Sequence, residues 1–231
     1  MPKSYKGFNK DMTCKGFQYE IGKEYEEEKA KACECGFHAC EYPLDCFGYY
    51  APAESKYCEV EQSGEISKNG DDSKVASSKI KIGAEIGIKG LIKAAFEYTK
   101  ERCTNHEIGG DCSALTGGDC SALTGGYRSA LTGGYRSALT GGNSSALTGG
   151  DCSALTGGNR SALTGGDRSV VYGGEYAKVR GGLHSVLAIQ YWVNGEFKCI
   201  KFKEVDGIKI KENTYYRLDS RGRFVEVKDN D

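Results

Sequence analysis

Five side chains able to bind a metal or to act as nucleophiles lie close together near the N-terminus: Cys33, Cys35, His38, Cys40 and Cys46. Zinc sites are built from paired Cys-x₂₋₄-Cys knuckles whose thiolates converge on a tetrahedron. Here a Cys-x-Cys step is followed by a Cys-x₅-Cys step, and no second knuckle comes after it. We therefore expect structural free thiols and no metal, while metal binding by Cys33, Cys35, His38 and Cys40 stays open as the alternative.

His38 is the candidate acid or base of this cluster. It follows a Gly-Phe step and precedes a short predicted helix that carries Asp45, an arrangement similar to the strand–helix core of ADP-ribosyltransferases. Spacing assigns it no glutamate partner, and the chain holds no phosphate-binding loop, serine elbow or paired-carboxylate motif. We expect a packed, hydrogen-bonded histidine and name no catalytic residue. An enzyme with an ADP-ribosyltransferase-like N-terminal domain is kept as an alternative.

The element that organises the chain is an eight-residue repeat, Gly-Gly-x-x-Ser-Ala-Leu-Thr, which runs ten times over residues 109–188. Eight residues suit one short strand and one tight corner, so two octads close a coil of sixteen residues and ten octads make about five coils. Ser and Leu share a parity and should face inward, while Ala and Thr face outward. We expect the glycine pair to supply positive φ at each corner and to let successive backbones approach closely.

The third and fourth octad positions vary while the interior stays fixed, which is how solenoids build recognition faces. Tyrosine and arginine are enriched at interface hot spots. The candidate binding residues are therefore Tyr127, Arg128, Tyr135, Arg136, Arg160 and Arg168. The alternative is that these positions only solvate a spacer. Cys112, Cys120 and Cys152 fall in the fourth position and are expected to be surface or corner thiols.

The octads at residues 125–132 and 133–140 resemble those of bacterial ice-nucleation proteins. The resemblance implies a β-solenoid with a sixteen-residue coil and with Ser and Leu inside. That family uses outward Thr-x-Thr rows on dozens of coils, whereas here Ala replaces the first Thr. The remaining outward threonines are Thr116, Thr132, Thr148 and Thr164 on one side and Thr124, Thr140 and Thr156 on the other. A weak ice- or water-ordering function is a further alternative.

The sequence before the repeat, residues 1–104, indicates an α+β domain. Alternating apolar residues predict strands at residues 17–21, with a hairpin after Gly22, and at residues 56–66 and 74–88, with a turn at residues 69–72 between the last two. The charged run at residues 24–31 is expected to be a solvated loop or helix. Pro43 should open a short helix that buries Leu44, Phe47 and Tyr50. Residues 89–102 are the best helix candidate and should cap the open apolar end of the solenoid at residues 105–188.

The C-terminal part, residues 189–231, indicates an antiparallel β module. Asn194-Gly195 is the strongest hairpin signal in the chain. Two further strands are expected at residues 215–218 and 224–227, and residues 229–231 should be frayed. The fold class is thus mainly β, a short β-solenoid capped by an α+β domain and by this module.

Both flanks resemble uncharacterised phage and prophage proteins. At the N-terminal side the similar segments are Lys6-Gly7-Phe8, Phe17-Gln18-Tyr19-Glu20, Gly36-Phe37-His38-Ala39-Cys40 and Pro43-Leu44-Asp45. At the C-terminal side they are residues 206–211 and Thr214-Tyr215-Tyr216-Arg217-Leu218. The resemblance implies a phage-type accessory protein with a variable repeat insert, and it brings no catalytic residues.

Composition limits the partners and the compartment. A net charge of −1 over 231 residues argues against nucleic-acid binding through bulk electrostatics. Eleven cysteines without an export signal indicate reduced thiols in a cytoplasm, that of the host if the protein is phage-encoded, and no apolar run is long enough to span a membrane. We expect a protein partner and no cofactor, and leave a homo-oligomer open. The leading hypothesis is a non-catalytic accessory protein whose rigid solenoid binds a macromolecule, for instance to inhibit a host defence protein.

Overall fold

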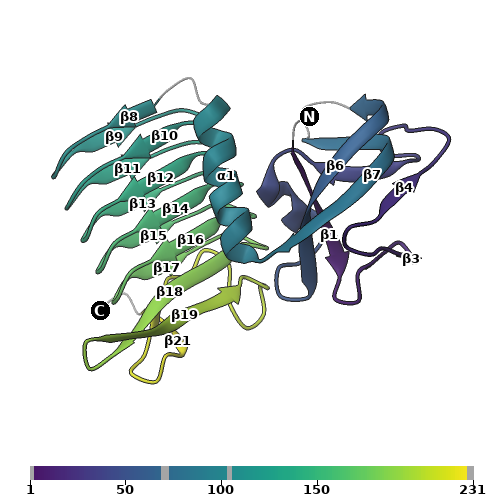
Figure 1. Ribbon diagram of the computed structural model, residues 1–231. Coiled ribbons are helices and arrows are strands. Elements are labelled where there is room, and N and C mark those ends of the chain that lie inside the picture. The colour runs from purple at the N-terminus through teal and green to yellow at the C-terminus, as the bar shows by residue number, and fades with distance from the viewer. Residues whose placement is uncertain (1–2, 69–72, 103–105, 228–231) are drawn as a thin grey trace. The chain divides into compact units, whose positions relative to one another are not determined.

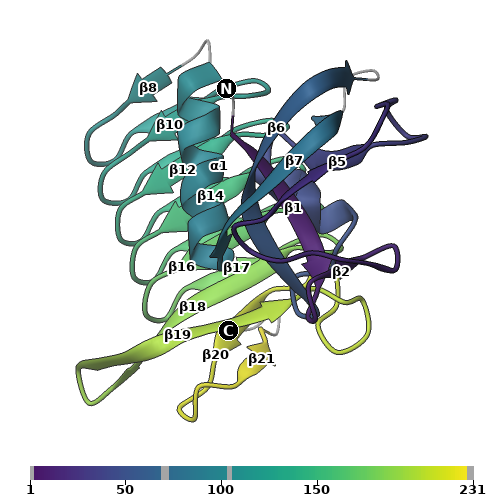
Figure 2. The same cartoon turned by 45° about the vertical axis from the view of Figure 1, so that its right-hand side comes forward.

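The computed structural model describes residues 3–68, 73–102 and 106–227 (Figures 1 and 2). It divides into two compact units, Met1–Ala95 and Phe96–Asp231. The turn expected at residues 69–72, the domain boundary expected after residue 104 and the frayed end expected at residues 229–231 lie outside the described residues. The mainly β fold class, with a β-solenoid of two octads per coil, is confirmed.

The first unit is built on a five-stranded antiparallel sheet in the order β4-β7-β5-β1-β6. Its strands are β1 (Ser4–Asn9), β4 (Glu24–Glu26), β5 (Phe37–Cys40), β6 (Ser55–Lys68) and β7 (Lys74–Ile86). Because β6 also pairs with β7, the sheet closes on itself around an apolar core. That core contains Phe8, Tyr19, Phe37, Ala39, Cys58, Val60, Ile80 and Ile82. The two long strands predicted from residues 56–66 and 74–88 are confirmed as β6 and β7.

The hairpin predicted after Gly22 is wrong. The expected strand at residues 17–21 is reduced to β3 (Phe17–Gln18), which pairs with β2 (Thr13–Cys14). Gly22 has a φ of +84° and its N–H donates to the carbonyl of Ile82. The chain is thereby turned toward β7, and β4 pairs there instead of folding back on β3. The charged run at residues 24–31 thus begins as a strand.

The short helix predicted at Pro43 is a 3₁₀ helix, η1 (Pro43–Gly48). Pro43 occupies its first turn, where no backbone N–H is required. Leu44 and Phe47 are buried as predicted, whereas Tyr50 is only half-buried. The helix thus contributes two of its apolar side chains to the interior of the unit.

The helix predicted at residues 89–102 is confirmed as α1 (Ile88–Arg102), which crosses the division between the units. In the second unit, the Thr99 hydroxyl donates to the carbonyl of Arg136 at 3.3 Å. Arg136 belongs to the fourth octad, so residues 96–102 of the helix lie beside the solenoid. The expectation that it covers the open end is therefore corrected. In the first coil Ile108 remains 74% exposed.

The solenoid consists of two facing parallel sheets (Figure 1). One sheet contains β8 (His106–Ile108), β10 (Ala122–Thr124), β12 (Ala138–Gly141), β14 (Ala154–Gly157), β16 (Val170–Gly173) and β18 (Val186–Val193). The other contains β9 (Ala114–Thr116), β11 (Ala130–Thr132), β13 (Ala146–Thr148), β15 (Ala162–Thr164) and β17 (Lys178–Arg180). Leu131 pairs with Leu147 and Leu139 with Leu155, so each coil contains sixteen residues as predicted. From Ser121 and Leu123 onward, the inward-facing serines and leucines are buried between the sheets, which confirms the predicted interior.

The prediction that the glycine pairs supply positive φ is wrong. The left-handed residue is the fourth of each octad, with φ between 53° and 60° at Cys112, Cys120, Arg128, Arg136, Ser144, Cys152, Arg160, Arg168, Tyr176 and His184. The glycines serve close approach instead. A Cβ on Gly133 would lie 2.7 Å from the Cβ of Ser137, and one on Gly142 would lie 2.7 Å from the carbonyl carbon of Gly126 in the preceding coil.

The C-terminal module continues both sheets of the solenoid. β18 turns at Asn194-Gly195, both with positive φ, into β19 (Glu196–Glu204), so the predicted hairpin is confirmed. β17 pairs with β20 (Tyr216–Leu218), which pairs in turn with β21 (Phe224–Glu226). Val205 and Tyr216 pack in the same apolar cluster as the solenoid leucines. The module thus covers the C-terminal end of the stack.

Candidate functional site

The predicted binding residues lie on two separate edges of the solenoid. Successive octads alternate between the two sheets, so their corners form two rows. We name the first row the Tyr127 edge, which consists of Tyr127, Arg128, Asn143, Ser144, Asn159, Arg160, Glu175 and Tyr176. We name the second the Tyr135 edge, which consists of Tyr135, Arg136, Asp151, Cys152, Asp167 and Arg168. Three of the six predicted residues fall on each edge, and the structure does not bring the two sets together.

The Tyr127 edge presents aromatic and cationic groups to solvent. Tyr127 is 42% exposed and Tyr176 is 67% exposed. The guanidinium of Arg128 lies 4.9 Å from the centre of the Tyr127 ring, and that of Arg160 lies 6.0 Å from the centre of the Tyr176 ring. Between the two tyrosines is a hollow of about 200 Å³ lined by Tyr127, Asn143, Ser144, Asn159, Arg160, Glu175 and Tyr176. Tyr176 was not predicted, although its place in the fourth octad position could have shown it.

The Tyr135 edge is less accessible. The guanidinium of Arg136 lies 4.8 Å from the centre of the Tyr135 ring, but the side chains of Arg136 and Arg168 are half-buried. The thiols expected at the surface or at corners are both: Cys112 and Cys120 are exposed, whereas Cys152 is buried at its corner, where its φ is 56°. Of the two edges, the Tyr127 edge therefore offers more free surface to a partner.

The third octad position has a structural role that was not predicted. Its Asp or Asn accepts, through Oδ1, a hydrogen bond from the backbone N–H sixteen residues further on, as Asp111 does from Tyr127 at 2.7 Å. The same bond is made by Asp119, Asn143, Asp151, Asn159 and Asp167. The recurrence of Asp and Asn at this position was the available signal.

Tyr127 and Tyr135 interrupt this ladder of side-chain acceptors. A tyrosine has no oxygen at the position of Oδ1, and among the described residues the N–H groups of Asn143 and Asp151 have no acceptor. A hydrogen bond of this kind contributes about 0.5–1.5 kcal/mol. The two tyrosines therefore occupy positions where an Asn would stabilise the coil more.

The outward threonines form the two predicted rows. The registers align Thr116, Thr132, Thr148 and Thr164 on one sheet and Thr124, Thr140 and Thr156 on the other. Thr116, Thr132 and Thr148 are exposed, and the other four are half-buried. Thr164 is half-buried, and its Oγ1 lies 2.7 Å from the hydroxyl of Tyr215. One exposed column of three threonines is a small surface for ordering ice.

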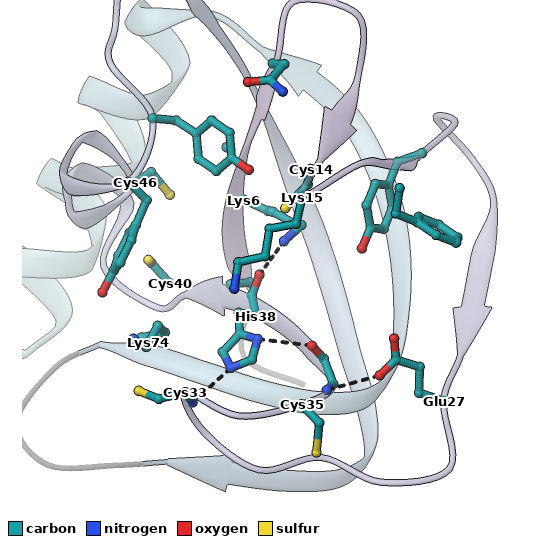
Figure 3. A pocket seen from close by; sticks show the side chains of 18 of the residues that line it. Lys6, Cys14, Lys15, Glu27, Cys33, Cys35, His38, Cys40, Cys46 and Lys74 are labelled. Carbon is teal, nitrogen blue, oxygen red and sulfur yellow. Dashed lines mark hydrogen bonds between the residues drawn. The ribbon is translucent and has the colours of Figure 1, made fainter.

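The first unit contains a cavity of about 870 Å³, shown in Figure 3. We name it the lysine cavity, because Lys6, Lys15 and Lys74 line it from β1, from the turn between β2 and β3, and from β7. Its other functional groups are His38, Glu27, Glu34, the thiols of Cys14, Cys33, Cys35, Cys40 and Cys46, and the rings of Phe17, Tyr19, Tyr49 and Tyr50.

His38 lines this cavity with both ring nitrogens already engaged. Nε2 accepts from the N–H of Cys33 at 3.0 Å, so Nδ1 carries the proton and donates to the carbonyl of Gly36 at 3.0 Å. Burial lowers the pKa of the imidazole, and the nearby charges of Lys6 and Lys74 lower it further. A neutral histidine with both nitrogens occupied has no free position for acid–base chemistry. The expectation of a packed, hydrogen-bonded histidine is confirmed.

Asp45 and Cys46 each make a hydrogen bond within the first unit. The carboxylate of Asp45 accepts a hydrogen bond from the Ser73 hydroxyl, and Asp45 does not line the lysine cavity. Cys46 donates its thiol hydrogen to the carbonyl of Tyr5 at 3.3 Å. Within the described ranges, no three His, Cys, Asp or Glu side chains converge as metal ligands would.

Comparison with known proteins finds one similarity, which is confined to the N-terminal part of the chain. Residues 2–94 match the model of a family described as a domain of unknown function (DUF7666). The match covers every residue of the lysine cavity and none of the solenoid. Neither a curated protein nor a solved structure matches the chain. In the part of the chain that the structure describes, no helix is long and apolar enough to cross a membrane.

Proposed function

We propose that this chain is a non-catalytic accessory protein of phage or prophage type that binds a protein partner through the Tyr127 edge of its β-solenoid. The observation that carries the proposal is Tyr127 itself. It forgoes the backbone hydrogen bond that Asp or Asn makes at the equivalent positions, and it presents an exposed ring with the Arg128 guanidinium stacked on it. A residue that costs stability and offers contact surface is typical of a recognition site.

The solenoid is suited to recognition because its edge is held rigidly. Each corner backbone is bonded to the next coil, for example from the Arg128 N–H to the Asn143 carbonyl at 2.9 Å and from the Ser144 N–H to the Asn159 carbonyl at 2.8 Å. Binding to a surface that is already ordered costs less conformational entropy than binding to a loop. The polar groups of Asn143 and Asn159 flank the tyrosines and can pair with amides of a protein partner.

The test is capture of a partner from a lysate of the native host, followed by mass spectrometry. The edge variant combines Tyr127→Asn with Arg128→Gly, because Asn restores the ladder and Gly tolerates the left-handed φ of 55°. The matched control combines Tyr135→Asn with Arg136→Gly on the other edge. We expect the edge variant to lose capture about tenfold or more, while the control retains it.

Equal capture by both variants and by the unmodified protein would refute the assignment of the site to this edge. Loss in the control alone would transfer the site to the Tyr135 edge. Once a partner is identified, its activity measured with and without the protein tests the inhibitory role. A cytoplasmic host protein, in a compartment that keeps thiols reduced, is the class of partner expected.

A further inference from the structure

The lysine cavity contains a buried ammonium group without an anionic partner. Lys6 is 6% exposed, and its Nζ donates one hydrogen bond, to the carbonyl of His38 at 2.8 Å. The same Nζ lies 5.6 Å from the ring centres of both Phe8 and Tyr19. Among the described residues, no carboxylate lies within ion-pair distance of it. Burying a charge is unfavourable unless a counter-charge is supplied, and two of the three ammonium hydrogens remain available for one.

The charges around Lys6 favour an anion in the cavity. Lys15 and Lys74 line the same space, and with Lys6 they outnumber the two lining carboxylates. Glu27 accepts a hydrogen bond from the N–H of Gly36 at 3.0 Å, and Glu34 pairs with Lys31 at 2.7 Å. Glu34 is thus paired with a lysine outside the cavity, whereas Glu27 keeps its charge, so the three lining ammonium groups are opposed by one unpaired carboxylate. The neutral His38 adds no charge. The cavity retains a positive charge that is suited to a doubly charged anion.

The walls of the cavity favour an anion that carries a ring. Phe17 is 49% exposed and Tyr49 is 51% exposed, so each presents part of its aromatic surface where it lines the cavity. The Lys74 Nζ lies 5.2 Å from the centre of the Tyr49 ring, which places a cation and an aromatic surface side by side. A volume of about 870 Å³ is within the range of sites for organic ligands. Free phosphate would fill only a small part of it.

We propose that the lysine cavity binds a nucleotide, with its phosphate on the ammonium groups of Lys6 and Lys15 and its base against the aromatic walls formed by Phe17 and Tyr49. Lysine is a common phosphate ligand, and its ammonium acts as a point charge. The site lies within the residues of the matched domain, and it is independent of the solenoid edge and its protein partner. It assigns a ligand class to that domain and requires no reaction.

The test is binding measured by calorimetry on the full-length protein at physiological ionic strength, with adenosine, guanosine, cytidine and uridine 5′-monophosphates as probes. Adenosine and inorganic phosphate are the controls that lack one half of the ligand. We expect at least one nucleotide to bind about tenfold or more tightly than either control. Phosphate binding as tightly as all the nucleotides would overturn the role of the rings. No binding of any nucleotide to the folded protein would overturn the proposal.

Two variants locate the binding in the cavity. Lys6→Met removes the buried charge with little change in side-chain volume. We expect this variant to fold, with a thermal midpoint of unfolding at least equal to that of the unmodified protein. We expect its affinity for the nucleotide to fall about tenfold or more. Lys23→Met, at an exposed lysine paired with Glu20 at 2.7 Å, is the matched control and should bind normally. Unchanged binding by a folded Lys6→Met protein would refute the site. Partner capture by Lys6→Met and nucleotide binding by the Tyr127 edge variant should both be normal, which separates this test from that of the proposed function.

Discussion

Tyr127 and Tyr135 stand at the octad position where six other side chains hold the next coil by an Asp or Asn oxygen. Such a hydrogen bond crosses from one coil to the next and recurs every sixteen residues. The octad therefore has one position where surface chemistry and stability compete. At Asn143 and Asn159 stability is kept, and at the two tyrosines contact surface is gained.

The replacement Tyr127→Asn should stabilise the solenoid. Its Oδ1 would lie where Asp111 places its own one coil earlier, and would accept from the N–H of Asn143. We expect the free energy of unfolding to rise by about 0.5–1.5 kcal/mol, measured by denaturant titration. Tyr127→Ala removes the same ring without supplying an acceptor and is the control. Equal stability of the Asn and Ala variants would contradict the role assigned to the ladder.

The backbone of the fourth octad position could not be predicted from residue types. Arg128, Cys120 and Tyr176 carry a Cβ, and the left-handed region costs such residues about 1–2 kcal/mol. The two glycines beside them were the natural candidates for positive φ. In the octad of Arg128 they serve close packing instead, because a Cβ on Gly125 would lie 2.6 Å from the Cβ of Ser129 and one on Gly126 would lie 2.9 Å from the backbone nitrogen of Asp111 in the preceding coil. The packing between coils decided which residue bears the strain, and that packing is absent from a single octad.

At the scale of elements, the second glycine of each octad fixes how closely two coils stack. A Cβ on Gly142 would lie 2.7–2.9 Å from three backbone atoms of Gly126 and Tyr127. Gly142→Ala should therefore push the coils apart and lower the free energy of unfolding by about 1–3 kcal/mol. Gly118 has the same place in the second octad, and nothing lies within 4 Å of its Cβ position. Gly118→Ala is the matched control and should leave stability within about 1 kcal/mol of the unmodified protein. Similar losses in both variants would contradict this account.

Elements with local signals were predictable, and those defined by distant partners were not. The alternation of β6 and β7, the helix α1 and the turn at Asn194-Gly195 are all encoded within a few residues. β4 was missed because its partner is β7, more than fifty residues further along the chain. The three lysines of the lysine cavity were missed for the same reason. Lys6, Lys15 and Lys74 come from three distant segments, and only the closed sheet brings them to one cavity.

At the scale of the whole molecule, the two ends of the solenoid differ in how their apolar interior is closed off. The C-terminal end is covered, since Val205 and Tyr216 join the leucine cluster. At the other end the stack stops at β8 and β9, and β8 pairs with β10 in a register that aligns Glu107 with Leu123. A charged residue thus occupies the place of an interior leucine in the first strand. Inward-pointing charges and short strands are ways in which proteins keep an exposed sheet edge from pairing with another chain.

Glu107→Leu should therefore allow two solenoids to stack end to end. The variant extends the row of interior leucines into β8, the first strand of the solenoid. The three-residue β8 then has an apolar inner position next to Ile108, which is already 74% exposed. We expect concentration-dependent self-association in sedimentation equilibrium, with the unmodified protein monomeric over the same range. Glu101→Leu makes the same change on exposed α1 and should leave the protein monomeric. If Glu107→Leu stays monomeric like this control, the charge of Glu107 is not what prevents end-to-end association. Self-association of the unmodified protein would show that Glu107 alone does not prevent stacking.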